Sequence, residues 1–585
     1  MELNEHLVDT IAPTKEARIK CNSQEWFDGE IADKIATRDK LFKKFKKSKL
    51  QIDSDLWNEA KKNTGKPKEL WKTLKSMGLD NSKKSDPNYC LKDEDALHFD
   101  TKSKLEIFKN FFSGLADGLL QNLPKPSNRF GINAVISYYK SLNIGNKIFN
   151  FQQVLEEDVL NLLNDTSTTK APGLDTISGI FLKDGADVLC RPITQLCNLS
   201  ISLSSFPSEL VHNQTQAFLD ENNILFKFQS GFRSCHSTDF CLLYIHDKIS
   251  KGFDAGLLSG MILIDLQKAF DTINHSILLE KLGTLGFSNE VILWFRSYLA
   301  NRTFCVSIDN LSSNPGKLEC GVPQGSILGP LLFLLYVNDM PQALVQCDLF
   351  LYADDSCLLF QHKDITEMEN ALNTDFSNLC DWFVDNKLSI HFGEDKTKSI
   401  LFASRGKIKK AEKLNISYNG VEIKQHTKVK YLGCIFDQSL SVLKKKLQVA
   451  QNKCVRFCLQ KSSRSHVGAT DFKEINWLSV GERFKVCVNN HAYKFFQKKC
   501  PLYMSDVFIP SSHRRASTRS SFQRLEQSCV KTPQGQQCLS YLGPSLWNTL
   551  PEGLKRSSTT NSFKHNLKKH YFDVITRRDS DDFVN

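Results

Sequence analysis

Two adjacent acidic residues, Asp354 and Asp355, interrupt an apolar stretch that runs from Leu349 to Phe360. A short run of this kind, rich in aromatic residues and bounded by polar segments, predicts two buried strands joined by a tight turn that carries both carboxylates. Carboxylates in apolar surroundings repel each other unless they are protonated, paired or bound to a cation. The pair therefore predicts either a divalent-metal site or an Asp-Asp turn that faces water at the tip of a hairpin.

A third carboxylate follows an apolar segment upstream. Residues 261–264 are Met-Ile-Leu-Ile and predict a strand, Asp265 comes next, and a helical pattern extends from Gln267 to Leu279. If this strand neighbours those of the aspartate pair in one sheet, the three carboxylates lie together. Three such groups can hold two Mg²⁺ ions, which activate an attacking hydroxyl and stabilise the leaving oxygens of a phosphoryl transfer.

Three motifs around these carboxylates occur in a characteristic order. They are Asp265-Leu-Gln-Lys-Ala-Phe-Asp271, Gly321-Val-Pro-Gln-Gly-Ser-Ile-Leu-Gly-Pro330 and Tyr352-Ala-Asp-Asp355. Together they resemble the palm of a reverse transcriptase from the non-long-terminal-repeat retrotransposons, of the jockey-like or chicken-repeat-like sort. The resemblance covers roughly residues 100–575. It implies an α+β fold of the right-hand polymerase type, with fingers, a split βαβ palm sheet, a thumb, and helical N- and C-terminal extensions.

The resemblance also implies a reaction and its participants. The primer 3′-hydroxyl of a DNA strand attacks the α-phosphate of a deoxynucleoside triphosphate that is paired with an RNA template. By resemblance, Asp265, Asp354 and Asp355 are the catalytic carboxylates and the ligands of two Mg²⁺ ions.

Four further residues are candidates for binding the nucleotide. By resemblance, the ring of Phe270 lies beneath the sugar and clashes with a ribose 2′-hydroxyl; a core phenylalanine is the alternative. Gln324 and Gly325 would support the nucleotide and the template strand, because glycines permit close approach of the backbone; a turn-rich connector is the alternative. Arg233, in the loop Phe228–Thr238, is either a phosphate contact or an ordinary surface arginine.

Lys396 is the fourth catalytic candidate. The segment Leu388–Phe402 is similar to one in which a family lysine acts near the leaving pyrophosphate, and Lys396 matches that lysine, with Lys398 as the second choice. A protonated amine at this place can act as a general acid, whereas a solvated lysine in a charged loop is the alternative. Downstream, Lys430–Phe436 resembles the hairpin that grips the primer end.

One element of the family's fingers is missing. Residues 167–183 resemble the N-terminal fingers loop, with a helix expected from Asp175. The family then continues into a hairpin whose cations hold the triphosphate, but here only residues 211–215 separate Leu210 from Gln216, which resembles the helix beyond that hairpin. Loss of these cations is expected to weaken triphosphate binding. A catalytically impaired, nucleic-acid-binding remnant is therefore the alternative function; a group II intron maturase is disfavoured by the C-terminal extension.

The chain is expected to contain four segments. Residues 1–90 form a basic helical N-terminal segment and linker, residues 91–440 the fingers and palm with a core at 167–436, residues 441–470 the thumb, and residues 471–585 a basic C-terminal extension.

Charge also points to a nucleic acid. The 585 residues include 76 Lys and Arg against 65 Asp and Glu, a net charge of +11, which favours a polyanionic partner. The cluster Arg38–Lys49 predicts an amphipathic basic helix on RNA phosphates, with a solvated helix or a nuclear-import signal as alternatives. Aromatic residues interspersed in the basic C-terminal extension are explained by RNA binding or by helical packing.

Composition and sequence patterns also indicate the cellular compartment of the protein. The 18 cysteines are scattered without CxxC pairs, which predicts free thiols in a reducing compartment. The N-terminus lacks the pattern of a signal peptide, and no run of about 18 apolar residues occurs. We therefore expect an intracellular protein of the nucleus or cytoplasm without a membrane segment. Because the segment before the fingers is short and basic, we also expect a truncated form without the family's endonuclease domain.

Overall fold

A computed structural model describes most of the chain from residue 91 onward. The described residues are 91–581 apart from 94–95, 99, 145–146, 169–177, 204–208, 309–310, 394, 409–412, 441–443, 460, 463–464, 512–522 and 534. The expected N-terminal segment 1–90, with its basic cluster Arg38–Lys49, lies outside these residues, as does the expected helix start at Asp175.

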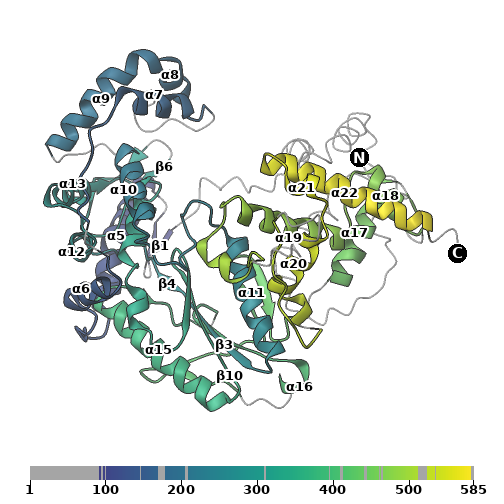
Figure 1. Ribbon diagram of the computed structural model, residues 1–585. Helices are drawn as coiled ribbons and strands as arrows, with labels where there is room; N and C mark the ends of the chain where they lie inside the picture. The colour runs from purple at the N-terminus through teal and green to yellow at the C-terminus, as the bar shows by residue number, and fades with distance from the viewer. Residues whose placement is uncertain are drawn as a thin grey trace.

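Helices and short strands alternate along the chain (Figure 1). The α-helices are α5 (Thr101–Gln121), α6 (Ile132–Ser141), α7 (Glu156–Asp165), α8 (Gly179–Asp184), α9 (Ala186–Ser202), α10 (Glu209–Glu221), α11 (Thr238–Asp254), α12 (His275–Thr284), α13 (Asn289–Leu299), α14 (Leu328–Tyr336), α15 (Ile365–Asp385), α16 (Arg405–Ile408), α17 (Lys444–Cys458), α18 (Ala469–Glu474), α19 (Val480–Phe496), α20 (Leu539–Asn548), α21 (Glu552–Lys555) and α22 (Thr560–Asp581). Three short 3-10 helices are η2 (Met340–Ala343), η3 (Leu502–Asp506) and η4 (Gly535–Gln537).

The strands are β1 (Leu91–Asp93), β2 (Ala96–His98), β3 (Leu258–Ile264), β4 (Leu266–Gln267), β5 (Arg302–Phe304), β6 (Ser307–Ile308), β7 (Leu311–Ser312), β8 (Gly316–Leu318), β9 (Asp348–Tyr352), β10 (Asp355–His362), β11 (Ser389–Ile390), β12 (Lys398–Phe402), β13 (Ile416–Tyr418), β14 (Val421–Ile423), β15 (Lys428–Tyr431) and β16 (Cys434–Asp437). The mixed α+β character predicted from the sequence is confirmed.

A four-stranded sheet in the order β12-β3-β10-β9 lies at the centre. Strand β10 pairs antiparallel with β3 on one side and with β9 on the other, and β12 pairs antiparallel with β3. Strands β3 and β9 are therefore parallel to each other with β10 between them. The helices α12, α13 and α14 connect β3 to β9, which makes this a split βαβ unit.

Alternate residues of the sheet enter two different cores. Ile262 and Ile264 of β3 pack in the core that contains helix α15, whereas Met261 and Leu263 pack in the core that contains α11. All seven residues of β3 are buried. The continuous apolar run that the sequence shows at this strand is explained by a helix on each face of the sheet.

The C-terminal helices are anchored to α11. Phe240 of α11 lies in one core with Trp547 of α20 and Phe563 of α22. The backbone N–H and the hydroxyl of Ser540 both donate to the carboxylate of Asp247, at 2.8 Å and 3.0 Å. Helix α11 therefore joins the sheet on one side to the C-terminal helices on the other (Figure 1).

Helices α7, α8 and α9 share a small core of their own and lie away from the central sheet (Figure 1). Its buried members are Val154, Val159, Leu163, Ala186 and Cys190. A face of α9 that does not enter this core is open to solvent, with Val188 79% exposed and Leu196 60% exposed.

Two of the helices predicted from the sequence have corrected boundaries. The helix expected from Gln267 is wrong at its start, because Gln267 belongs to β4 and pairs with β11. Helix α12 begins only at His275, where the Asn274 side chain accepts a hydrogen bond from the Ile277 N–H at 3.1 Å.

The second correction concerns the segment before residue 202. The helix expected from Asp175 is interrupted here, because Gly185 ends α8 and α9 begins directly after it. An alanine Cβ at Gly185 would lie 3.1 Å from the Phe181 carbonyl oxygen, so the chain bends tightly at this glycine.

Helix α10 occupies the positions at which the family's hairpin is expected to be missing. It runs without interruption through residues 211–215, and Val211, Thr215 and Leu219 are buried along one of its faces. The predicted helix at Gln216 is confirmed and begins earlier, at Glu209. None of the described helices combines the length and the apolar character needed to cross a membrane.

Candidate active site

The predicted turn with two carboxylates is present. Strand β9 ends at Tyr352 and β10 begins at Asp355, which pairs with Tyr352 across a turn formed by Ala353 and Asp354. Ala353 has a φ of 56°, in the left-handed region that alanine rarely adopts. The buried Gln229 supports this backbone from outside, because its Oε1 accepts a hydrogen bond from the Ala353 N–H at 2.9 Å.

The loop that contains Gln229 is in close contact with the turn. The same Oε1 also accepts a hydrogen bond from the Gly231 N–H at 2.8 Å. A Cβ on Gly231 would lie 2.3 Å from the Ala353 nitrogen, so only glycine fits here. On the other side of the loop, the hydroxyls of Ser230 and Tyr503 are 2.9 Å apart. The turn that carries the carboxylates is therefore supported by the loop and, through it, by the C-terminal region.

Asp265 comes to the same end of the sheet. It directly follows β3, whose Ile264 lies opposite Ser356 of β10. The pKa of Asp355 is raised to about 6 by loss of hydration and by the negative charges of Asp354 and Asp265. Burial and the charge of Asp265 also raise the pKa of Asp354. The three carboxylates therefore repel one another across the ends of β3 and β10, as the sequence predicts.

This donor set fits a divalent cation in its chemistry. Carboxylate oxygens are the ligands that Mg²⁺ prefers, and a cation removes the repulsion that raises the pKa of Asp355. Within the described parts of the chain, no three His, Cys, Asp or Glu side chains are close enough to ligate one ion as they lie. Binding an ion here therefore requires the carboxylates to rotate toward one another.

Lysines line the other side of this site. A cleft of about 180 Å³ is bordered by Asp265, Asp355, Lys396, Lys398 and Lys430. The Nζ of Lys396 lies 3.4 Å from Oδ2 of Asp265, whereas the Nζ of Lys398 donates to a backbone carbonyl at 3.2 Å. The first choice from the sequence is thus the lysine that contacts a carboxylate. Lys430 was not singled out, although it belongs to the predicted hairpin, which β15 and β16 confirm.

Phe270 is half-buried and lies among aromatic rings. It stacks on Phe333, with ring centroids 4.4 Å apart and planes at 20°, and meets the ring of Phe232 edge-on at 6.1 Å. Phe232 is 57% exposed and has a φ of 52°. Phe232 is not among the residues predicted from the sequence; its place between Gly231 and Arg233, in a loop already marked by resemblance, is the signal that could have identified it.

Gln324 and Gly325 lie in a loop that packs against Phe270. The Val322 N–H donates to the Phe270 carbonyl at 2.9 Å, and Nε2 of Gln324 donates to Oδ1 of Asp271 at 2.9 Å. Gly325 has a φ of 84°, which a glycine adopts without strain. The structure thus brings Phe270, Gln324 and Gly325 together.

Comparison with known families shows what this arrangement is. Residues 199–436 match the family described as reverse transcriptase (RNA-dependent DNA polymerase). The chain carries a reverse transcriptase domain. The matched range contains all eight site residues predicted from the sequence: Arg233, Asp265, Phe270, Gln324, Gly325, Asp354, Asp355 and Lys396.

Curated relatives of the reverse transcriptase domain come from mobile elements. "Probable RNA-directed DNA polymerase from transposon BS" of Drosophila melanogaster is 32% identical over 258 residues, which are 43% of this chain and 28% of the relative. "RNA-directed DNA polymerase from mobile element jockey" is 30% identical in Drosophila melanogaster, over 41% of this chain and 26% of the relative. The Drosophila funebris protein of that name is 27% identical, over 53% and 32%. The chain thus spans less than a third of each relative, and the resemblance to jockey-like elements is confirmed.

Arg233, also a predicted site residue in the reverse transcriptase domain, contacts its own loop and not the carboxylates. Its Nη1 donates to the carbonyls of Phe226 and Gln229, at 2.9 Å and 3.2 Å. It borders a separate cavity of about 290 Å³ together with Tyr138 and His236. These contacts hold the backbone of the loop that supports the catalytic turn, while the predicted phosphate contact stays a prediction.

Proposed function

We propose that the reverse transcriptase domain catalyses RNA-directed DNA synthesis. In this reaction a primer 3′-hydroxyl attacks the α-phosphate of a deoxynucleoside triphosphate paired with an RNA template, and pyrophosphate leaves. The observation that supports this most strongly is the convergence of Asp265, Asp354 and Asp355 at the ends of two paired strands, within the segment that matches the reverse transcriptase family.

The carboxylates and Lys396 would share the chemistry. Asp265, Asp354 and Asp355 would hold two Mg²⁺ ions, which when bound supply positive charge for the attacking hydroxyl and the phosphates. The ion pair with Asp265 holds Lys396 beside the site. From there its ammonium group would give a proton to the leaving pyrophosphate.

Phe270 would select the sugar. Stacking on Phe333 fixes the plane of its ring, so the ring forms a wall that does not yield to an additional hydroxyl group. A ribose 2′-hydroxyl would collide with this wall, whereas a deoxyribose would not. Gln324, held by its hydrogen bond to Asp271, would support the nucleotide and its template partner.

The C-terminal region would hold the nucleic acid. Residues 441–585 contain 25 Lys and Arg against 10 Asp and Glu, a net charge of +15, whereas residues 1–440 contain 51 against 55. Phosphates are attracted by such an excess of cations. The C-terminal helices, which are anchored to α11, would therefore bind the template–primer duplex. We assign α17 to the thumb, the central sheet to the palm and α7–α9 to the fingers.

A second candidate function is that of a nucleic-acid-binding remnant with impaired catalysis. The observation that favours it is helix α10, which occupies the positions of the expected fingers hairpin and contains no Lys or Arg. Without cations from this segment, the triphosphate loses charge-assisted hydrogen bonds that offset its own repulsion.

Primer extension tests the proposal. The full chain is incubated with Mg²⁺, deoxynucleotides and a DNA primer on an RNA template, beside the variants Asp354→Asn and Glu280→Gln. Glu280 is exposed on α12. Glu280→Gln is therefore a control that removes a carboxylate outside the site. Extension by the wild type and by Glu280→Gln, but not by Asp354→Asn, supports the proposal. Absence of extension by all three, with RNA binding that weakens as salt rises, supports the remnant instead.

A further inference from the structure

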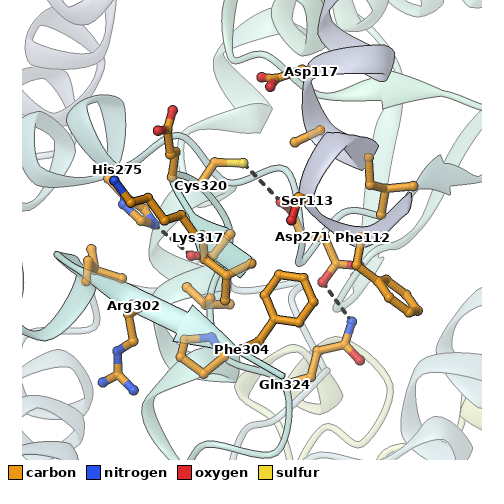
Figure 2. A pocket seen from close by; sticks show the side chains of 18 residues that line it. Phe112, Ser113, Asp117, Asp271, His275, Arg302, Phe304, Lys317, Cys320 and Gln324 are labelled. Atoms are coloured by element: carbon orange, nitrogen blue, oxygen red, sulfur yellow. Dashed lines mark hydrogen bonds between the residues drawn. The ribbon is translucent and has the colours of Figure 1, made fainter. Parts of the chain in front are cut away.

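Another cavity, of about 440 Å³, is lined in part by the loop that carries Gln324 (Figure 2). Its walls come from helix α5, from the hairpin of β5 and β8, and from residues 320–324. None of its lining residues borders the cleft that contains Asp265, Asp355 and Lys396. Asp271 and Gln324 belong to this cavity, so the loop separates it from Phe270.

Two aromatic rings form the apolar part of the cavity. Phe112 of α5 and Phe304 of β5 meet edge to face, with centroids 6.3 Å apart and planes at 89° (Figure 2). A Cβ on Gly316 would lie 2.7 Å from the Phe304 ring, so the absence of a side chain there gives this ring its place. Phe112 remains 46% exposed, which leaves ring surface available to a planar ligand.

Charged groups of both signs surround these rings. Arg302 and Lys317 supply cations, and Asp117, Asp271 and Glu319 supply carboxylates. The Nε of Arg302 donates to the Tyr298 carbonyl at 2.8 Å, which positions its guanidinium group at the cavity. A base can stack on the rings, its amino groups can donate to carboxylates, and a phosphate can pair with the cations.

The thiol in the cavity does not suggest metal or nucleophile chemistry. Cys320 Sγ donates to the Asp271 carbonyl at 3.4 Å. Burial, Asp117 and the other carboxylates around the thiol raise its pKa to about 11, so it stays protonated at neutral pH. The cavity is therefore suited to an organic ligand with a planar ring, whose polar groups can meet charges of either sign.

We propose that this cavity binds the unpaired template nucleotide that follows the one being copied. This inference rests on the proposed function. A base pair formed beside Phe270 and Gln324 places its incoming nucleotide toward Asp265 and Asp355. The template partner then lies toward the other side of the Gln324 loop, and the next nucleotide of that strand reaches the cavity. A volume of about 440 Å³ lies within the usual range for a small-ligand site.

The hydrogen bond from Gln324 to Asp271 links the two sites, because both residues line the cavity and Asp271 directly follows Phe270. A nucleotide held there keeps the template strand in line with the next position to be copied. The triphosphate cleft has no role in this step, so binding can be measured without chemistry.

Affinity for template overhangs tests the proposal. The dissociation constant is measured by fluorescence anisotropy, without Mg²⁺ or deoxynucleotides, for an RNA–DNA hybrid with a blunt end and for the same hybrid with a short single-stranded RNA template overhang. The wild type should bind the overhang hybrid more tightly. Phe112→Ala should reduce this preference about tenfold, the size of one lost base–aromatic stack, and leave blunt-end binding unchanged. Lys317→Ala should reduce it as well.

Phe111→Ala is the matched control. Phe111 precedes Phe112 on the same helix, is 55% exposed, and is not part of the cavity wall. Its ring meets that of Phe112 edge to face at 5.3 Å, but Phe112 keeps its contact with Phe304 when Phe111 is replaced. Its substitution should leave the overhang preference unchanged. Equal losses in Phe111→Ala and Phe112→Ala, or no overhang preference in the wild type, would overturn the proposal.

Photo-crosslinking provides a second, independent measurement. A 4-thiouridine at the first unpaired template position should crosslink to α5 or to the β5–β8 hairpin; crosslinks confined to other segments would overturn the proposal. Its failure is distinguishable from failure of the proposed function. A chain that shows the overhang preference but never extends a primer lacks only the polymerase activity. A chain that extends primers without that preference lacks only the template-nucleotide site.

Discussion

The central sheet and the helices α7–α9 differ in how completely they bury their apolar side chains. Every residue of β3 is buried, and the turn at Asp354 is supported by Gln229 and Gly231. On α9, by contrast, Val188 and Leu196 are largely exposed. The part of the molecule that carries the carboxylates is thus complete in its packing, whereas the proposed fingers present an uncovered apolar face.

The proposed reaction has two requirements, which are positioned carboxylates and closure around a triphosphate. This difference shows that the two are separable. The carboxylates depend on strand pairing and on contacts behind the turn, all of which are present. In the proposed reaction, closure around a triphosphate would depend on the fingers, and α10 occupies the positions of the hairpin expected there.

The close contact behind the catalytic turn is the most sensitive feature. In Gly231→Ala the new Cβ would meet the Ala353 nitrogen at 2.3 Å, which displaces the turn and its carboxylates. We expect primer extension to fall more than about a hundredfold, because small displacements of reacting groups have effects of this size. Gly118→Ala, on a part of α5 where an added Cβ meets no atom within 4 Å, should leave extension unchanged; an equal loss there would refute the steric explanation.

Lys396 should matter more than Lys398. Lys396→Met removes the ammonium group beside Asp265, and we expect kcat to fall about a hundredfold, as for loss of a general acid. The KM for deoxynucleotides should change little. Lys398→Met removes a lysine that is bonded to a backbone carbonyl and should lower kcat only a few-fold. Single-turnover kinetics measures both values, and similar losses in the two variants would contradict the assignment.

The C-terminal core should lose stability in acid. Burial, and then Lys494, lower the pKa of His491 to about 4 against the opposing charge of Asp239. The unfolded chain, with an ordinary histidine pKa near 6.5, takes up the proton first, so the free energy of unfolding decreases as the pH falls from 6.5 toward 4. At pH 5 this amounts to about 2 kcal/mol.

Urea denaturation at pH 7 and pH 5 measures this effect. His491→Gln should remove that share of the pH dependence and leave the part due to His236, whose pKa burial also lowers to about 4. His565→Gln, at an exposed position of α22, is the control. An unchanged pH dependence in His491→Gln would show that His491 does not titrate as described.

The smallest effect is expected on the uncovered face of α9. Leu196→Ser should change the free energy of unfolding by no more than about 0.5 kcal/mol, as for other exposed positions. Leu163→Ala, in the small core shared by α7, α8 and α9, should instead lower the free energy of unfolding by about 2 kcal/mol or more. Thermal denaturation compares the two. A large loss in Leu196→Ser would mean that this face is covered in solution, which would remove the contrast with the central sheet.

Local sequence patterns determined most of the secondary structure and the identity of the carboxylates. The apolar run with its aspartate pair predicted β9, the turn and β10, because alternation and turn chemistry act over a few neighbouring residues. The helix that was expected from Gln267 shows the limit of such patterns. A periodic signal does not reveal that Gln267 pairs with β11 across more than a hundred residues.

Contacts between distant segments were decided only by the tertiary structure. Gln229 supports Ala353 from 124 residues away, and Asp247 accepts hydrogen bonds from Ser540 across 293 residues. Neither contact leaves a local pattern, since each depends on where packing brings two separate elements. Local patterns alone therefore identify the residues that could perform the chemistry. Packing between distant segments then sets which of them meet, which loop supports them, and where the cavity beside the Gln324 loop lies.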